Sequence, residues 1–152
     1  MEIFIQKIEK GNELIKEGQI EEAIVFFAEL MEEFPEEPLV FYNSAIAFIE
    51  KENFEISEKL LTHCLNLGYN NHRVFLGLGY CHLKKNELEI SRTFFSKIKE
   101  GEESFLESLI GIVYSFILEG KISDTKPFLE ILKKSSFWNQ ELRLVERTLR
   151  TL

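Results

Sequence analysis

A spacing of 34 residues recurs through this 152-residue chain and constrains its fold more than any other feature. Shifting the sequence by that length superposes two sets of small residues, namely Gly11, Ala45 and Gly79, and then Ala23, Ser57, Ser91 and Thr125. Small side chains at fixed positions allow two helices to approach closely. A period between 20 and 50 residues is typical of proteins that stack one supersecondary unit repeatedly. We therefore expect an array of similar units.

The other positions of the repeat indicate that each unit is a pair of helices. Apolar residues also superpose and predict core ridges, one of which comprises Phe27, Leu61, Phe95 and Leu129. The middle of each unit is occupied by Gly18, Glu52, Asn86 and Gly120, respectively. Glycine and asparagine adopt a left-handed backbone most readily, so these positions predict a turn between two helices.

In this register the chain resembles the tetratricopeptide repeat (TPR) family over nearly its full length. The repeats are residues 4–37, 38–71, 72–105 and 106–139, without insertion or deletion. The proline typical of the end of each unit remains only as Pro35, and Val113 stands where a small residue is usual. The resemblance implies an all-α fold, a right-handed TPR solenoid of four helix-turn-helix repeats within a single domain over residues 1–152.

A C-terminal capping helix is expected over residues 140–152. Asn139 can cap its first turn, and Arg147 and Arg150 near its end suit the helix dipole. Its apolar stripe comprises Leu142, Val145, Leu149 and Leu152. This segment resembles the end helix of such arrays, which covers the last repeat with one face and meets solvent with the other.

The composition excludes several classes of function. The chain has 18 basic and 26 acidic residues, a net charge of −8, and we expect no face rich in Lys and Arg and no binding of nucleic acid. The apolar stretch 109–118 is too short to span a membrane and predicts a buried helix without membrane insertion. The first residues lack the apolar region of a signal peptide, and Cys64 and Cys81 suit buried, reduced thiols. These features favour a cytoplasmic location.

The residues that could carry catalysis or hold a metal are few. Two Cys/His neighbours, His63-Cys64 and Cys81-His82, could supply zinc ligands, but Cys64 and His82 fall on core ridges while His63 is expected to face solvent. Cys64 lacks the positive neighbourhood and the nearby base that a nucleophilic thiol needs. We therefore predict no catalytic residue, no metal, no cofactor and no enzymatic activity.

The resemblance to TPR proteins implies that the first helix of each unit lines a concave groove. The lining positions are Ile5, Ile8, Asn12 and Ile15; Leu39, Tyr42, Ile46 and Ile49; Arg73, Leu76, Tyr80 and Leu83; and Glu107, Ile110, Tyr114 and Ile117, with Asn43 adjoining. Thirteen of the sixteen lining residues are apolar or tyrosine. An apolar groove of this kind suits a client protein that offers an apolar or extended segment. An alternative is that neighbouring helices already bury most of these side chains.

Two narrower resemblances concern the client. Asn12, Asn43 and Arg73 are similar to part of the family's two-carboxylate clamp for chaperone tails, but Ile8 and Gly77 replace two of its cations. The stretch from Leu61 to Cys81 resembles class II chaperones of type III secretion, which hold hydrophobic translocator proteins in the bacterial cytoplasm and often form homodimers. The chain is thus expected to be such a chaperone or, alternatively, a generic TPR scaffold in a stable protein assembly.

Overall fold

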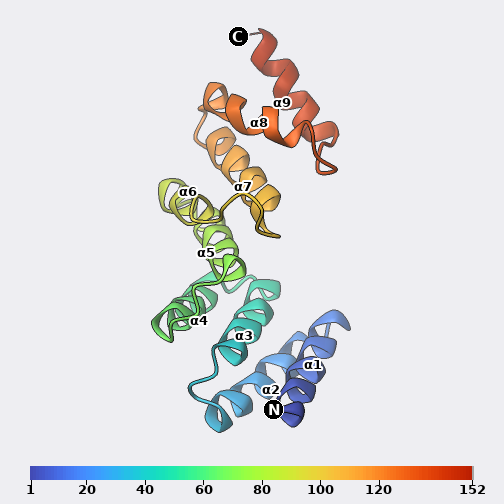
Figure 1. Ribbon diagram of the computed structural model, residues 1–152, viewed down its shortest axis with the longest axis vertical. Coiled ribbons are helices and arrows are strands. Elements are labelled where there is room, and N and C mark those ends of the chain that lie inside the picture. Colours follow the sequence, from blue (N-terminus) through green and yellow to red (C-terminus); the bar gives the residue numbers. More distant parts are fainter. Residues whose placement is uncertain (152) are drawn as a thin grey trace.

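The computed structural model describes residues 1–151, which form helices and connecting turns without any strand. In chain order the elements are α1 (Glu2–Lys16), α2 (Ile20–Glu33), α3 (Pro38–Glu50), α4 (Phe54–Asn66), α5 (His72–Lys84), α6 (Leu88–Phe95), α7 (Phe105–Leu118), the 3-10 helix η1 (Ile122–Thr125), α8 (Lys126–Leu132) and α9 (Gln140–Thr151). The helices stack along one long axis, with α1 and α2 at one end and α9 at the other (Figure 1). Leu152, the last residue of the expected capping helix, lies outside the described residues.

The turns inside the helix pairs have the left-handed backbone that the period predicts. The φ angles are 78° at Gly18, 61° at Asn86 and 77° at Gly120. Glu52 adopts the same conformation with a φ of 59°, although its side chain is not one that favours it. The position in the repeat therefore determines the turn even where the residue type does not.

The small residues are located where helices touch. A Cβ atom added to Gly79 of α5 would come within 2.5 Å of the Phe95 ring in α6, and one added to Gly111 of α7 would come within 2.4 Å of the same ring. Gly11 has the corresponding contact with Phe27 in the first helix pair. The Phe95 ring is thus enclosed by its own unit on one side and by the next unit on the other.

The second set of small residues adds hydrogen bonds to this packing. The Ser57 hydroxyl donates to the Ala45 carbonyl oxygen at 3.0 Å, and the Ser91 hydroxyl donates to the Gly79 carbonyl oxygen at 2.7 Å. Both serines are fully buried, as are Ala23 and Thr125 at the equivalent positions. A buried hydroxyl requires such a partner, and here it links the two helices of one pair.

Some local details differ from the sequence expectation. His63 does not simply face solvent, because its ring packs against Phe41 with the ring centroids 4.4 Å apart and its side chain is half-buried. Helix α6 ends already at Phe95, and Ile98 is buried from the turn that follows. The fourth helix pair closes through η1 and the short α8, with Val113 fully buried instead of a small residue.

The last helix covers the end of the stack as expected from its stripe. The Asn139 side chain accepts a hydrogen bond from the Leu142 amide at 3.0 Å, and Leu142 is buried with Leu129 and Leu132 of α8. Within residues 1–151, no helix has both the length and the apolar character that crossing a membrane requires.

Candidate functional site

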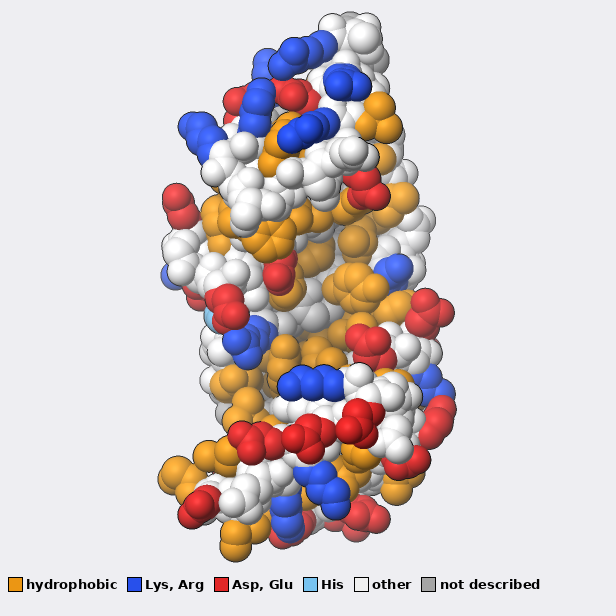
Figure 2. Space-filling model, turned by 90° about the vertical axis from the view of Figure 1, so that its right-hand side faces the viewer, with side chains coloured by type: hydrophobic (Ala, Val, Ile, Leu, Met, Phe, Trp, Pro, Cys, Tyr) orange, Lys and Arg blue, Asp and Glu red, His pale blue; other side chains and the backbone are white. Residues whose placement is uncertain are grey.

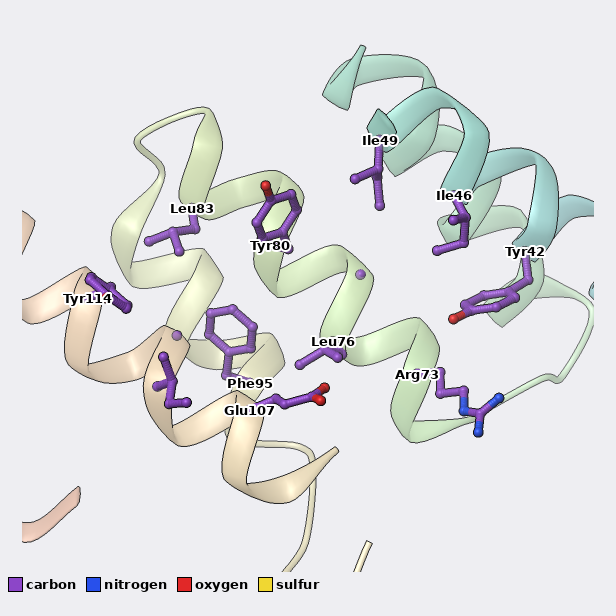
Figure 3. Close-up of a pocket in the computed structure, with 13 residues that line it drawn as sticks. Tyr42, Ile46, Ile49, Arg73, Leu76, Tyr80, Leu83, Phe95, Glu107 and Tyr114 are labelled. Atoms are coloured by element: carbon purple, nitrogen blue, oxygen red, sulfur yellow. The ribbon is translucent and has the colours of Figure 1, made fainter. Parts of the chain in front are cut away.

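The first helices of three consecutive pairs, α3, α5 and α7, enclose an apolar cavity of about 400 Å³. Its lining comprises Tyr42, Ile46, Ile49, Arg73, Leu76, Gly77, Tyr80, Leu83, Phe95, Glu107, Ile110, Gly111 and Tyr114 (Figure 3). The space-filling view shows hydrophobic side chains gathered in a hollow on this face, with charged side chains around it (Figure 2). The middle and later part of the solenoid therefore carries a candidate binding groove.

Helical spacing explains why these side chains converge. On α5 the lining residues Arg73, Leu76, Tyr80 and Leu83 follow each other by three or four positions, so they share one face of the helix. The same spacing relates Tyr42, Ile46 and Ile49 on α3, and Glu107, Ile110 and Tyr114 on α7. The 34-residue period then places the three faces side by side.

The floor of the cavity consists of residues that the sequence reading did not assign to it. Gly77 and Gly111 lie 34 residues apart, and each allows a side chain of the preceding unit to approach its backbone closely. That side chain is Leu61 at Gly77 and Phe95 at Gly111. Because Gly111 has no side chain, the Phe95 ring reaches the floor of the cavity between α5 and α7. The 34-residue spacing of Gly77 and Gly111 is the sequence feature from which this cavity floor could have been predicted.

Accessibility differs along the groove. Tyr80 is the most open of the apolar lining residues at 37% exposure, and the aliphatic side chains of Ile46, Leu76 and Ile110 are half-buried. A half-buried apolar side chain in a hollow retains area that a bound segment can cover. The groove wall is thus neither sealed inside the chain nor fully exposed.

Seven of the predicted groove residues lie outside this cavity, among them Ile5 of α1, which is 50% exposed. Ile8 is only 9% exposed and packs with Phe27 and Leu30 in the core of the first pair, where Ile15 also packs. Asn43 is buried, Asn12 is half-buried, Leu39 is 37% exposed and Ile117 packs against the core near α8. Ile8 and Asn43 therefore belong to the helix packing and not to an open wall, because the adjoining helices cover them.

Two of the polar side chains that were predicted to lie in the groove, Asn43 and Arg73, are engaged with other parts of the chain. The Asn43 amide donates to the Leu39 carbonyl oxygen at 2.7 Å, and the Arg73 guanidinium donates to the Glu103 carboxylate at 2.6 Å. This hydrogen bond raises the pKa of Arg73 and lowers the pKa of Glu103. A carboxylate clamp that used Arg73 would first have to displace Glu103.

Two tyrosines define the ends of the groove. Burial raises the pKa of Tyr42, which lies near Arg73 on the α3 side. The Tyr114 hydroxyl donates to the Glu141 carboxylate of α9, and this hydrogen bond raises the Tyr114 pKa. The capping helix therefore contacts the groove through Tyr114 and fixes the orientation of that ring.

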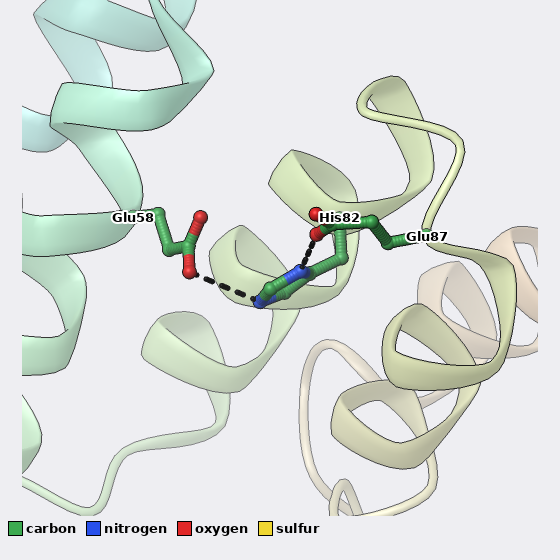
Figure 4. Close-up of side chains that lie close together, drawn as sticks. All are labelled: Glu58, His82 and Glu87. Atoms are coloured by element: carbon green, nitrogen blue, oxygen red, sulfur yellow. Dashed lines mark hydrogen bonds and ion pairs between the residues drawn. The ribbon is translucent and has the colours of Figure 1, made fainter.

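A second polar cluster lies away from the groove, where α4 meets the turn between α5 and α6. His82 is buried between two carboxylates, with Nε2 3.6 Å from Glu58 and Nδ1 hydrogen-bonded to Glu87, and its ring stacks on Phe94 (Figure 4). These three residues have the ligand types of a metal site. The Lys85 ammonium, however, lies 2.6 Å from Glu58 and 3.2 Å from Glu87 and balances their charge. The cluster therefore functions as an ion-pair network that joins three helices.

The two thiols are packed in the core between α3, α4 and α5. Burial raises the pKa of Cys64 to about 12 and also raises that of Cys81. The Cys64 Sγ lies 3.4 Å from the Pro38 carbonyl oxygen, to which it donates. A thiol with so high a pKa remains protonated at neutral pH, which disfavours nucleophilic catalysis.

Comparisons with known proteins identify the architecture. The sequence matches no protein-family model and shows no significant similarity to a curated protein. Among solved structures, YrrB, described as a TPR protein with an unusual peptide-binding site, superposes with a TM-score of 0.73 at 17% identity, over 86% of this chain and 67% of that one.

Two further structures agree with this result. A tetratricopeptide repeat protein from Parabacteroides merdae gives a TM-score of 0.73 at 16% identity, over 95% of this chain and 57% of that one. The pilF protein of Pseudomonas aeruginosa gives a TM-score of 0.75 at 17% identity, over 93% of this chain and 65% of that one. The chain thus spans about two thirds or less of the length of these proteins. Together with the stacked helix pairs, these matches show that the protein has the TPR fold, an all-α solenoid of helix-turn-helix units.

Proposed function

We propose that this protein is a non-enzymatic protein-binding module whose groove between α3, α5 and α7 binds an apolar segment of a client protein. The observation that carries the proposal is the cavity of about 400 Å³ whose wall consists almost wholly of aliphatic and tyrosine side chains. Such an apolar hollow on a solvent-exposed surface is typical of a site that another molecule covers. A peptide in extended form or one face of a helix has the matching shape and chemistry.

The available area supports binding of moderate affinity. Apart from the buried Phe95, eight apolar and tyrosine side chains line the cavity. If a client covered about 30 Å² on each of them, and buried as much of its own surface, about 480 Å² of surface would be removed from water. At about 25 cal/mol per Å² this contributes roughly 12 kcal/mol. Association costs an estimated 4–15 kcal/mol, whereas micromolar affinity requires a net of about 8 kcal/mol. We therefore expect micromolar or weaker binding through the groove alone.

The proposal is tested by placing a charge in the groove. Ile46→Glu and Tyr80→Glu should each abolish capture of the client from a cell extract while the helical circular dichroism stays unchanged. Ile90→Glu is the matched control, because Ile90 is 47% exposed on α6 and does not line the cavity. Client capture that survives both groove substitutions would contradict the proposal.

The finer version is that the protein is a cytoplasmic chaperone for a hydrophobic client, specifically a type III secretion translocator. Its motivation is that the stretch from Leu61 to Cys81 resembles class II chaperones of type III secretion. Within that stretch Leu61, Cys64, Val74, Leu78 and Cys81 form one buried core cluster. These residues therefore satisfy helix packing and contribute nothing to client contact, so the support for this version comes from the groove chemistry.

Co-expression separates the chaperone from the alternative, a scaffold in a stable assembly. A chaperone should raise the soluble fraction of its client and release it when the client reaches its destination. A scaffold should instead co-purify with its partners in fixed stoichiometry. A client that stays equally soluble without this protein would exclude the chaperone role.

A further inference from the structure

The two ends of the solenoid have opposite charge. Residues 1–37 contain 11 acidic and 3 basic side chains, a net charge of −8, whereas residues 38–152 contain 15 of each sign. Within that second part, residues 121–152 carry seven basic and four acidic side chains. Lys and Arg gather at the end of the molecule formed by α8 and α9 (Figure 2). This basic end corrects the expectation that no part of the surface concentrates cations.

The acidic end has a distinct surface, which we call the N-terminal edge. It is a shallow hollow on α1 and α2 lined by Lys10, Leu14, Glu21, Glu22, Val25, Phe26 and Glu29. Val25 is 59% exposed, and Lys10 lies over the Phe26 ring at 5.3 Å. The centre of this edge is therefore apolar and its rim is mainly carboxylate.

The repeat shows what kind of surface this edge is. One, two and three periods after Lys10 come Ser44, Leu78 and Ile112, and all three are buried. In the later units a preceding helix pair contributes to covering this position. Lys10 thus lies where a further unit would stack. Glu22 and Val25, in contrast, lie at positions that remain exposed in the later units, for example at Ile90 and Thr93, so the α2 part of the N-terminal edge is an outer surface.

The opposite surface, the C-terminal edge, is the outward face of α9. Leu142 points into the core, whereas Gln140, Glu141, Arg143, Leu144 and Arg147 line a shallow outer hollow. The Glu141 carboxylate of this hollow accepts the hydrogen bond from the Tyr114 hydroxyl. Leu144 is 63% exposed between the two arginines, and neither arginine has an ion-pair partner among the described residues. This edge has an apolar centre and a mainly cationic rim in which Glu141 is the one carboxylate within residues 1–151, and so complements the N-terminal edge.

We propose that the occupant of each edge is a second copy of this chain, so that the C-terminal edge of one molecule docks head to tail on the N-terminal edge of the next. Arg143 and Arg147 would face Glu22 and Glu29, with Leu144 against Val25 and Phe26. Opposite charges and apolar centres both match, whereas either edge facing its own kind would repel. Such a contact uses two different surfaces and therefore extends into chains instead of closing a symmetric dimer. It leaves the groove free and is independent of the proposed client.

The test is sedimentation velocity of the purified protein over a range of concentrations, at about 20 mM and about 500 mM salt. We expect concentration-dependent association at low salt that weakens at least about tenfold at high salt, since the rim charges are solvent-exposed. Glu22→Lys/Glu29→Lys and Arg143→Glu/Arg147→Glu should each abolish association. An equimolar mixture of these two variants should restore it, because each then offers the edge that the other lacks.

Glu55→Lys/Glu89→Lys is the control, because both carboxylates are exposed and lie on neither edge. This variant should associate as the wild type does. A chain that stays monomeric at low salt, an association that survives reversal at either edge, or a mixture that fails to recover would overturn the proposal. Binding of the Arg143 and Arg147 face to anionic vesicles or to DNA without self-association would assign the edge to another occupant.

Discussion

Gly79→Ala tests the packing that forms the groove floor. The added Cβ would lie 2.5 Å from two atoms of the Phe95 ring, and the ring cannot retreat because its other side meets the Gly111 backbone. Overpacking a core costs about 1–3 kcal/mol, whereas alanine gains about 1 kcal/mol over glycine inside a helix. Because the ring is held on both sides, we expect the upper end of the overpacking cost, about 3 kcal/mol. After the gain from alanine, the free energy of unfolding should fall by about 2 kcal/mol. For a chain of this size that lowers the Tm by about 4–8 °C.

The matched control is Gly77→Ala, the same substitution two residues earlier in α5. Its Cβ would meet chiefly the Cδ1 atom of Leu61 at 2.8 Å, which is the end of a flexible side chain. Rotation of that side chain limits the cost to about 1 kcal/mol, which the helix preference of alanine offsets. Thermal unfolding followed by circular dichroism measures both variants. Equal Tm values for Gly79→Ala and wild type would contradict the claim that the Phe95 ring is enclosed on both sides. An equal decrease in Tm in the two variants would contradict it as well.

Three further predictions concern buried and paired groups. Because burial raises the Cys64 pKa to about 12, native protein should react with a thiol reagent at pH 7 far more slowly than urea-unfolded protein, and equal rates would contradict its burial. Ser91→Ala removes the hydrogen bond to the Gly79 carbonyl and should cost about 1 kcal/mol in urea unfolding, whereas no loss would exclude a contribution of that bond. Arg73 lowers the Glu103 pKa below its ordinary 4.5, so the carboxylate contributes stability above that value which is lost as the pH falls through the lowered pKa. Glu103→Gln should therefore lose less Tm than wild type between about pH 6 and pH 3, and an equal loss in both would count against the pair.

The repeat period predicted the features that depend on local spacing. It located the four left-handed turns, including Glu52, and the buried small residues such as Ser57 and Ser91. The resemblance to TPR proteins, and not the period alone, implied the helix faces on which Ile46, Leu76 and Tyr80 lie, and these three residues line the cavity. These features follow from one helix pair that is repeated in register. The environment of a residue in one repeat therefore predicts the environment of the equivalent residues in the other repeats.

Contacts between long side chains that lie far apart in the sequence could not be predicted in the same way. The Arg73 pair with Glu103 and the Tyr114 bond to Glu141 join residues at unrelated positions of the repeat, and side-chain length and rotamer decide them. Ile8 was expected in the groove but is buried, because packing with Phe27 and Leu30 competes for the same side chain. The period defines a helix face, whereas the helices packed around it decide which part of that face stays open.

Site-specific photo-crosslinking in the source cell tests the central claim, that the groove holds an apolar segment of another protein. A photoreactive phenylalanine derivative would replace Tyr80 in the groove and, in a parallel experiment, Ile90 on α6. The account predicts that the Tyr80 position crosslinks to a client at an apolar segment, whereas the Ile90 position does not. A client that crosslinks at Ile90 and not at Tyr80 would contradict it.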